Sequence, residues 1–251
     1  EYRLLQNDTN SEPEEFTTED DIQLPNSGFE DWYTDSDGLP KPAKDASSSF
    51  WDCGNVNYFG KHIMTTQNDE TALGQGSSVK METQETMKII AAGNIFTGTF
   101  ERDGMGGILT LGRNFECRPN KLKGYYKYTS AKVSVSKGHL NEGEDDLCSL
   151  YIALTDEQIT VNTNKGIYFD PNSSAVIAYG SISDEESKGA DSFKEFTVDL
   201  EYKDLKRIPK YIIVVASSSK YGDYMEGGKG STMWLDDLEL VYPKSMEEVR
   251  K

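Results

Sequence analysis

The sequence predicts an all-β protein, a jelly-roll β-sandwich. Short runs of β-branched and aromatic residues recur along the 251-residue chain, and helical periodicity over ten residues is hard to find. Segments rich in Gly, Asn, Asp and Ser separate these runs, as turns separate the strands of a sandwich. A hydrophobic content of 36% is enough for a substantial core.

The first and last strands are expected at residues 26–33 and 232–242, and alternation defines the clearest strands between them. In segments 121–128 and 193–202, apolar residues at even positions alternate with mostly polar residues at odd positions, which predicts strands with one solvated face. Residues 211–219 begin as a continuous apolar run, which predicts a strand covered on both faces at the centre of a sheet. Further strands are expected around Val79, Phe96, Leu109, Ile152, Tyr168 and Ile177.

The predicted sandwich occupies residues 22–243. Residues 1–21 are rich in Glu, Asp, Asn, Ser and Thr and lack periodic apolar residues, so they are expected to form a flexible acidic tether. Residues 244–251 form a short C-terminal tail. No linker rich in Pro, Gly and Ser separates two apolar blocks after the tether, so one domain is expected.

The charge balance narrows the function classes. The chain contains 43 Asp and Glu but only 26 Lys and Arg. The resulting net charge of -17 argues against binding to nucleic acid or anionic lipid. No stretch approaches the ~20 apolar residues that span a bilayer, and no signal peptide is seen. The protein is therefore either cytoplasmic or a processed export product, and a tether before one domain suits a secreted or lipid-anchored protein.

Two carboxylates are candidate metal ligands. Alternation places Glu30 on one face of the first strand with Trp32, and it places Asp236 on the core side of the last strand with Leu238. A carboxylate that faces a core must be hydrogen-bonded, protonated or bound to a cation. Oxygen donors suit Ca²⁺, so the two could form a structural calcium clasp. Hydrogen bonds to backbone amides and neighbouring turns are the alternative.

Two loops combine aromatic rings with polar side chains, as a sugar site requires. They are residues 50–62 and 217–231, and a short basic segment around residues 113–118 adds arginines. Many aromatic residues must belong to the core, so burial is the alternative for each ring. The candidate ligand-binding residues are Trp51, Asn55, Tyr58, Arg113, Arg118, Tyr221, Asp223 and Glu226.

Catalysis has no sequence signature here. Glycoside hydrolysis needs two carboxylates roughly 5–10 Å apart, and the order of residues selects no pair among the 43 acids. A GxSxG elbow and phosphate-binding glycine motifs are absent from the sequence. The catalytic residues, if there are any, are therefore not predicted.

Four segments in order resemble one known family. They are LPNSGFEDW at 24–32, AAGNIFTGTF at 91–100, RPNKLKGYYKY at 118–128 and GSTMWLDDLELVY at 230–242. Together they are similar to the putative carbohydrate metabolism domain of Bacteroidetes surface lipoproteins. The resemblance implies a jelly roll related to galactose-binding-like carbohydrate-binding modules, a lipid anchor at the cell surface or outer membrane, and a role in glycan use. Related modules carry a structural calcium, and Glu30 and Asp236 occupy the matching places.

The leading functional hypothesis is a non-catalytic carbohydrate-binding module of a cell-surface glycan-utilisation lipoprotein. Its expected partners are an oligo- or polysaccharide and other surface glycan-utilisation proteins. One alternative is a glycoside hydrolase that uses paired carboxylates on the sandwich face or loops. Another is a structural surface protein or adhesin, which predicts a flat surface without a pocket.

Overall fold

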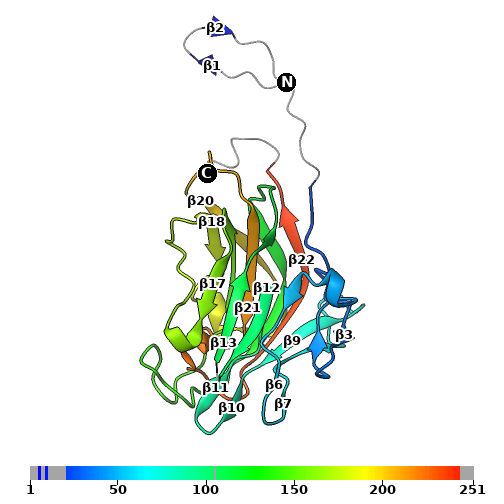
Figure 1. Cartoon of the computed structure of the whole chain (residues 1–251), viewed down its shortest axis with the longest axis vertical. Helices are drawn as coiled ribbons and strands as arrows, with labels where there is room; N and C mark the ends of the chain where they lie inside the picture. The colour runs from blue at the N-terminus through cyan, green and yellow to red at the C-terminus, as the bar shows by residue number, and fades with distance from the viewer. Residues whose placement is uncertain (1–4, 7–8, 11–20, 105, 244–251) are drawn as a thin grey trace.

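The computed structural model describes residues 5–6, 9–10, 21–104 and 106–243, and these residues form a jelly-roll β-sandwich of two antiparallel sheets (Figure 1). The large sheet has the order β17-β13-β12-β21-β16-β18-β20, with β14 paired to β21 and β5 paired to β12. Its strands are β5 (Trp51–Asp52), β12 (Asn94–Asp103), β13 (Gly106–Leu111), β14 (Arg113–Asn114), β16 (Ser149–Thr155), β17 (Ile159–Asn162), β18 (Val176–Ser181), β20 (Glu201–Tyr202) and β21 (Tyr211–Ser217).

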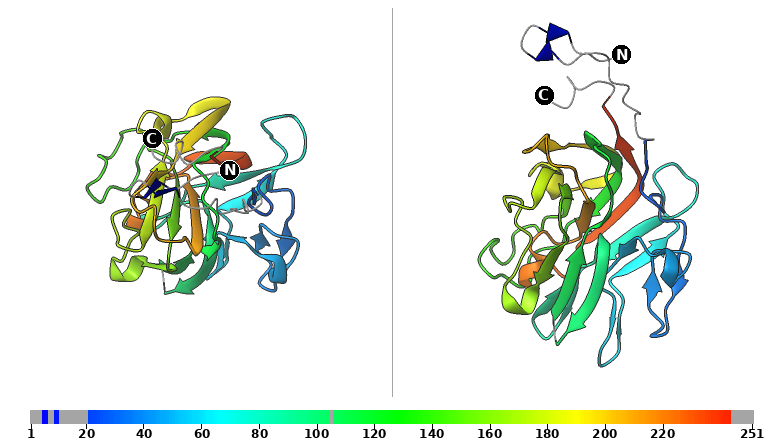
Figure 2. Two further views of the ribbon diagram at one scale, coloured as in Figure 1. Left: turned by 90° about the horizontal axis from the view of Figure 1, so that it is seen from above. Right: turned by 45° about the horizontal axis from the view of Figure 1, so that its top comes forward.

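The small sheet has the order β19-β15-β22-β9-β8. Its strands are β8 (Thr65–Asn68), β9 (Ser78–Glu82), β15 (Lys121–Thr129), β19 (Ala190–Asp199) and β22 (Thr232–Val241). Figure 2 shows the two sheets from two further directions. The predicted fold class is therefore confirmed.

Short pairs of strands and single helical turns lie outside the two sheets of the sandwich. The pairs are β1 (Leu5–Gln6) with β2 (Thr9–Asn10), β3 (Tyr33–Thr34) with β4 (Pro40–Lys41), β6 (Val56–Asn57) with β7 (Lys61–His62), and β10 (Gln84–Thr86) with β11 (Ile89–Ala91). The 3₁₀ turns are η1 (Ala46–Ser48), η2 (Thr163–Lys165), η3 (Glu186–Lys188) and η4 (Gly222–Tyr224). None of the helices in the described ranges is long and apolar enough to cross a membrane.

The core lies between the two sheets and follows from strand alternation. On β15, Leu122 and Tyr126 point into the core, whereas Lys121 and Lys127 lie on the outer face, as predicted. On β21, Ile212 and Val214 pack in this core, and Ile213 packs on the opposite face of the large sheet. This strand lies between β12 and β16, so the predicted central strand is also confirmed.

Two strand predictions are wrong, and a third needs revision. Residues 26–33 form a turn, and only Tyr33 joins a strand, because Phe29 adopts a left-handed conformation with φ 56°. The segment around Tyr168 is irregular. Alternation in 193–202 is correct, but the chain changes sheets within it, from β19 in the small sheet to β20 in the large sheet.

A bulge in β22 changes which residues face the core. Tyr125 pairs with Asp236 and Lys123 pairs with Glu239, so β22 contains one extra residue between these pairs. Asp237 takes up the irregularity with φ 47°. As a result Leu235 and Leu238 both enter the core, and Asp236 is buried on the outer side of the small sheet rather than in the core.

The predicted tether (1–21) and tail (244–251) lie almost wholly outside the described residues, so their boundaries stay predictions. The first described residue of the main body is Asp21, and the last is Pro243.

Gly98 provides a test of the close approach between β12 and β13. Its φ is 151°, and an added Cβ would lie 2.3 Å from the carbonyl oxygen of Thr110. Gly98→Ala should therefore lower the free energy of unfolding by roughly 2–4 kcal/mol, through backbone strain and steric overlap. Urea denaturation measures this loss.

Gly60→Ala is the matched control, because Gly60 has φ 126° but nothing within 4 Å of the added Cβ. It should cost only the conformational part, about 1 kcal/mol. Equal losses for the two variants would contradict the close approach.

Candidate functional site

The large sheet carries an aromatic cavity on its outer face, the face turned away from the core. The cavity has a volume of about 410 Å³. Tyr151 on β16 and Tyr179 on β18 form its floor, because alternation turns these side chains away from the core-facing Leu150 and Ile152. Two chain segments, 168–171 and 220–224, complete the wall with the aromatic residues Tyr168, Phe169, Tyr221 and Tyr224.

The rings of this cavity are packed against one another. Tyr151 and Phe169 stack with centroids 4.8 Å apart and planes at 19°. Tyr168 and Tyr224 stack at 4.0 Å and 29°. Such offset pairs restrict ring motion and hold the aromatic surface in place before a ligand arrives.

Asp223 is the carboxylate at the aromatic cavity that lacks a protein partner. Among the described residues, none donates a hydrogen bond to its carboxylate or forms an ion pair with it. Desolvation raises its pKa above the usual range. Burial raises the pKa of Tyr151 well above its usual value, and the charge of Asp223 adds to the rise. A desolvated carboxylate of this kind can accept hydrogen bonds from a ligand.

Asp184, the other acid at the aromatic cavity, is in a different environment. Its side chain is 94% exposed, and its Oδ1 lies 3.1 Å from Nζ of Lys220. Water and the ammonium group therefore satisfy this carboxylate.

Glu226 lies beneath the aromatic residues as a support. Its fully buried carboxylate accepts hydrogen bonds from the backbone amides of Lys137, His139 and Leu140. Desolvation opposes ionisation, but these donors and the His139 ring lower the pKa of Glu226 overall. The His139 ring stacks on Tyr221 at 4.4 Å and 16°. Glu226, predicted as a ligand contact, is instead inaccessible and positions this ring.

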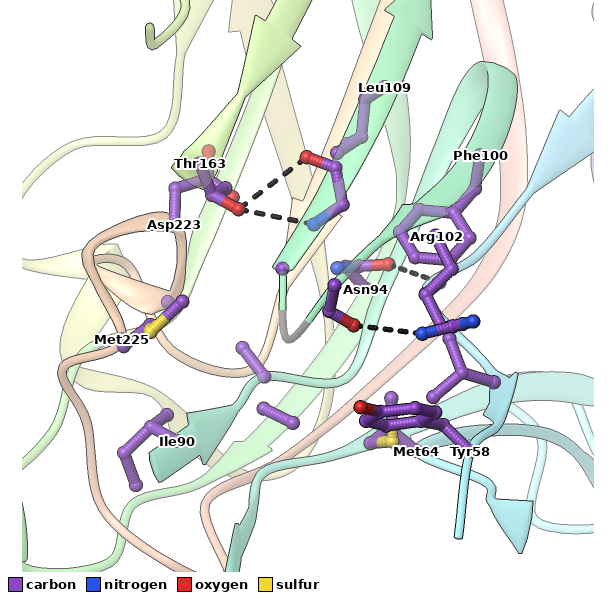
Figure 3. Close-up of a pocket in the computed structure, with 18 residues that line it drawn as sticks. Tyr58, Met64, Ile90, Asn94, Phe100, Arg102, Leu109, Thr163, Asp223 and Met225 are labelled. Carbon is purple, nitrogen blue, oxygen red and sulfur yellow. Dashed lines mark hydrogen bonds between the residues drawn. The ribbon is translucent and has the colours of Figure 1, made fainter. Parts of the chain in front are cut away.

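A second cavity, of about 140 Å³, lies on the other side of η4 (Figure 3). It is bordered by Gly104 after β12, by Gly106 and Gly107 at the start of β13, and by the hairpins β6–β7 and β10–β11. Tyr58 lines it beneath the guanidinium of Arg102, whose Cζ is 4.2 Å from the ring centroid. Asp223 lines both cavities.

The candidate ligand residues fall into two groups. The structure brings Tyr221 and Asp223 together at the aromatic cavity and places Tyr58 at the second cavity. The others serve the fold, and Glu226 is described above. Trp51 is 0% exposed, and its Nε1 donates to the Pro25 carbonyl oxygen at 2.7 Å, so no ring face is free to stack on a sugar.

The two predicted arginines are also structural. Arg113 donates from Nε to the Phe50 carbonyl at 2.9 Å and from Nη2 to the Gly98 carbonyl at 2.6 Å. Arg118 donates to the carbonyl of Arg207. Neither lines a described cavity. Both therefore leave the set of ligand candidates.

Asn55 is buried and cross-links the chain. Its Oδ1 accepts from the amides of Met64 and Thr65, both at 2.9 Å, and its Nδ2 donates to the carbonyls of Thr65 and Pro40. These bonds use its whole hydrogen-bonding capacity. Asn55 is thus also removed from the ligand candidates.

The calcium candidates lie on either side of the loop 69–77. Glu30 is exposed, contrary to the inward prediction, and its carboxylate accepts from the Ser77 amide and hydroxyl. Asp236 is 2% exposed and accepts from the Ala72 amide at 2.8 Å. Burial raises the pKa of Asp236 to about 6, and the negative charges of Asp237 and Glu30 add to the rise. The hydrogen bond from the Ala72 amide lowers the pKa but does not cancel this effect.

In the described part of the chain, no group of three or more His, Cys, Asp or Glu side chains is arranged to hold a metal ion. A cation bound here would therefore need backbone carbonyls as well as the carboxylates.

Several site residues escaped sequence analysis. Tyr151 and Tyr179 lie within apolar strands, and only the assignment of the two faces of the large sheet would have separated them from the core. Tyr168 and Phe169 were assigned to a strand that does not form. No sequence pattern marked Arg102, because its candidacy depends on its position over the Tyr58 ring.

Comparison with known proteins identifies the family. The model of the putative carbohydrate metabolism domain matches residues 23–241, nearly the whole described chain. The family predicted from the four sequence segments is therefore confirmed. No curated protein matches the chain.

Two solved structures are similar to this chain. A putative glycoside hydrolase from Bacteroides thetaiotaomicron VPI-5482 is 25% identical, with a TM-score of 0.58, over 73% of this chain and 58% of that one. A putative glycoside hydrolase from Bacteroides vulgatus ATCC 8482 is 24% identical, with a TM-score of 0.57, over 71% of this chain and 77% of that one. The chain thus spans little more than half the length of the first.

The role assigned to Asn55 can be tested by truncation. Asn55→Ala should lower the free energy of unfolding by about 2–4 kcal/mol, because it leaves the buried amides of Met64 and Thr65 without a hydrogen-bond acceptor. Urea denaturation measures the loss. Asn57→Ala is the control, since this exposed side chain makes only a 3.4 Å bond to the Asp37 carbonyl, and its stability should not change. A stable Asn55→Ala protein would contradict the cross-linking role.

Proposed function

Because the chain belongs to the putative carbohydrate metabolism domain family, we propose that it is a non-catalytic carbohydrate-binding module. In this proposal a glycan occupies the aromatic cavity on the large sheet. The observation that carries the proposal is the combination of packed tyrosine rings with the unpartnered carboxylate of Asp223.

The chemistry of this cavity suits a sugar. The C–H faces of a pyranose ring pack on aromatic rings, and sugar hydroxyls need acceptors and donors at the edges. Asp223 supplies an acceptor, while Lys220 and Asp184 supply a donor and an acceptor at the exposed side. Because the rings already stack on one another, little entropy is lost when a glycan binds.

Hydrolysis is the second candidate, because Asp223 has the raised pKa that a general acid needs and both similar structures are of putative glycoside hydrolases. Binding is favoured because Asp184, the other acid of the cavity, is ion-paired and almost fully solvated. The adhesin hypothesis predicts a flat surface, which a cavity of about 410 Å³ does not support.

The proposal extends to the setting of the protein. We place it outside the cytoplasm, as a lipid-anchored protein at the cell surface that works with other glycan-utilisation proteins. The support is the family resemblance and the tether-like composition of residues 1–21.

A glycan array followed by calorimetry tests the binding proposal. The intact chain should bind at least one glycan, and Tyr224→Ala or Asp223→Asn should weaken that binding about tenfold or more, as lost stacking or a lost charged hydrogen bond predicts. Tyr125→Ala is the matched control, because Tyr125 is also half-buried but lies on the outer face of the small sheet. The affinity of the Tyr125→Ala variant for the glycan should equal that of the unaltered protein.

The same glycans distinguish binding from hydrolysis. Binding without release of reducing sugar supports the module. Cleavage that Asp223→Asn abolishes would establish the hydrolase instead, and the absence of binding across the array would contradict both.

The calcium clasp stays part of the proposal. Glu30, Asp236 and the neighbouring Asp237 gather negative charge around a buried carboxylate, which a divalent cation would neutralise. Each oxygen of Glu30 retains a lone pair beyond its bond to Ser77. The oxygen chemistry therefore fits Ca²⁺, which would join the start of the domain to β22.

Calcium should raise the melting temperature by roughly 3 °C or more at pH 7, and EDTA should reverse the effect. The raised pKa means that folded Asp236 keeps its proton between about pH 4 and 6, while the unfolded chain releases it. Without cation, stability should therefore fall as the pH rises through this window. Since protons compete with Ca²⁺, the calcium effect should be smaller at pH 5. Differential scanning calorimetry measures both.

Asp236→Asn should abolish the calcium effect without destabilising the cation-free protein at pH 7, because it removes a desolvated charge. Glu239→Gln, which alters an exposed acid on the same strand, should keep the effect. If calcium changes nothing at either pH, hydrogen bonds alone hold these carboxylates.

A further inference from the structure

We propose that the second cavity is a subsite for an acidic sugar, whose carboxylate is bound by Arg102. The inference rests on the proposed function and names its ligand class: a glycan that contains uronic acid units. It depends on the position and the unused donors of one guanidinium group.

The guanidinium of Arg102 is held at the cavity by two contacts. It lies over the ring of Tyr58, 4.2 Å from Cζ to the ring centroid. Its Nη1 donates to the carbonyl oxygen of Gly104 at 3.0 Å, in the turn after β12. Figure 3 shows Arg102 between this carbonyl and the Tyr58 ring, at the border of the cavity. The planar fork is thus oriented before a ligand binds.

Most of the donors of Arg102 remain unused. A guanidinium has five N–H groups, and among the described residues only the Gly104 carbonyl accepts a hydrogen bond from this side chain. No carboxylate lies within ion-pair distance of it in the described chain, whereas Arg207 pairs with both Asp156 and Asp204. Arg102 is exposed, so its remaining N–H groups are accessible to an acceptor from outside the chain.

The other side of the cavity favours a sugar over a simple anion. Asp223 borders the same space and receives no hydrogen bond from the described residues, so its carboxylate can accept hydrogen bonds from the hydroxyls of a ligand. A uronic acid carries a carboxylate for Arg102 and hydroxyls for Asp223 on one ring. Met64 and Ile90 give the space an apolar wall. Inorganic anions would meet only one of these demands.

Asp223 also connects the two cavities. It lines both, and the η4 turn that carries it presents Tyr224 to the aromatic cavity and Gly222 to the second cavity. One oligosaccharide could therefore place a unit on the tyrosine rings and the next acidic unit beside Arg102.

The net charge of -17 works against an acidic polymer at long range, as it does against nucleic acid, but it does not decide the energy of the bound state. Charges farther than about 8 Å are largely screened at physiological salt, so the local pair decides the energy. A bidentate bond between arginine and a carboxylate is the strongest available contact of this type. The acidic surface instead predicts slow association at low salt.

The test uses polygalacturonate, alginate and glucuronoxylan, each compared with its carboxyl-reduced form. Reduction turns the carboxylate into a hydroxymethyl group and leaves the remaining polymer unchanged. Calorimetry of the full chain should show at least one acidic polymer bound about tenfold more tightly than its reduced form, the value of a charged hydrogen bond. Arg102→Met should remove this difference, because methionine keeps the apolar contact with Tyr58 but lacks the charge.

Two further variants sharpen the result. Arg102→Lys should recover only part of the preference, since an ammonium group cannot bind in the bidentate manner. Lys165→Met removes the same charge from an exposed residue that borders neither cavity, and it should keep the full preference. Equal melting temperatures would show that the variants fold.

The outcomes separate the two proposals. Binding of neutral or reduced glycans with no acidic preference, or a preference that survives Arg102→Met, overturns the Arg102 subsite and leaves the binding module. The absence of binding to every acidic, reduced and neutral glycan overturns both.

Discussion

The large sheet must bury both of its faces, and the rest of the structure follows from this constraint. One face of β16 and β21 meets the small sheet across the core, while the other carries a second apolar cluster that includes Phe96 and Ile213. A single sheet packed against the large one can cover only one face. The second face is therefore covered by loops, which leave spaces that a continuous sheet would fill. Both cavities lie in these spaces, on either side of η4.

The sequence predicted the strands better than their surroundings. Alternation identified β15, β19 and β22, and the continuous apolar run identified β21, because burial on one or both faces leaves a direct pattern. It failed at residues 26–33, where the left-handed Phe29 interrupts alternation, and at Asp237, where one extra residue shifts every later side chain of β22. Such backbone irregularities depend on tertiary contacts and have no periodic signal.

The site was less predictable than the fold for a related reason. Loop composition indicated Tyr221 and Asp223, and the structure places both at the aromatic cavity. Trp51 and Asn55 come from an equally aromatic and polar loop that the fold buries. Composition describes which groups are available, whereas exposure is decided by packing between distant segments. Arg102, near the end of β12, became a candidate only through its position over Tyr58 in the structure.

Hydrogen-bond partners distinguish the buried acids that support the fold from an acid that could bind a ligand. Asp146 accepts from the Ser219 hydroxyl and the amides of Leu147 and Gly228, and Glu226 accepts from three loop amides, so the protein satisfies both. Asp223 is desolvated too, but the described residues supply no donor for it. Its carboxylate is therefore available to accept hydrogen bonds from a ligand. The aromatic rings around it support the proposal that this ligand is a sugar, and the free donors of Arg102 support the proposal that the sugar is acidic.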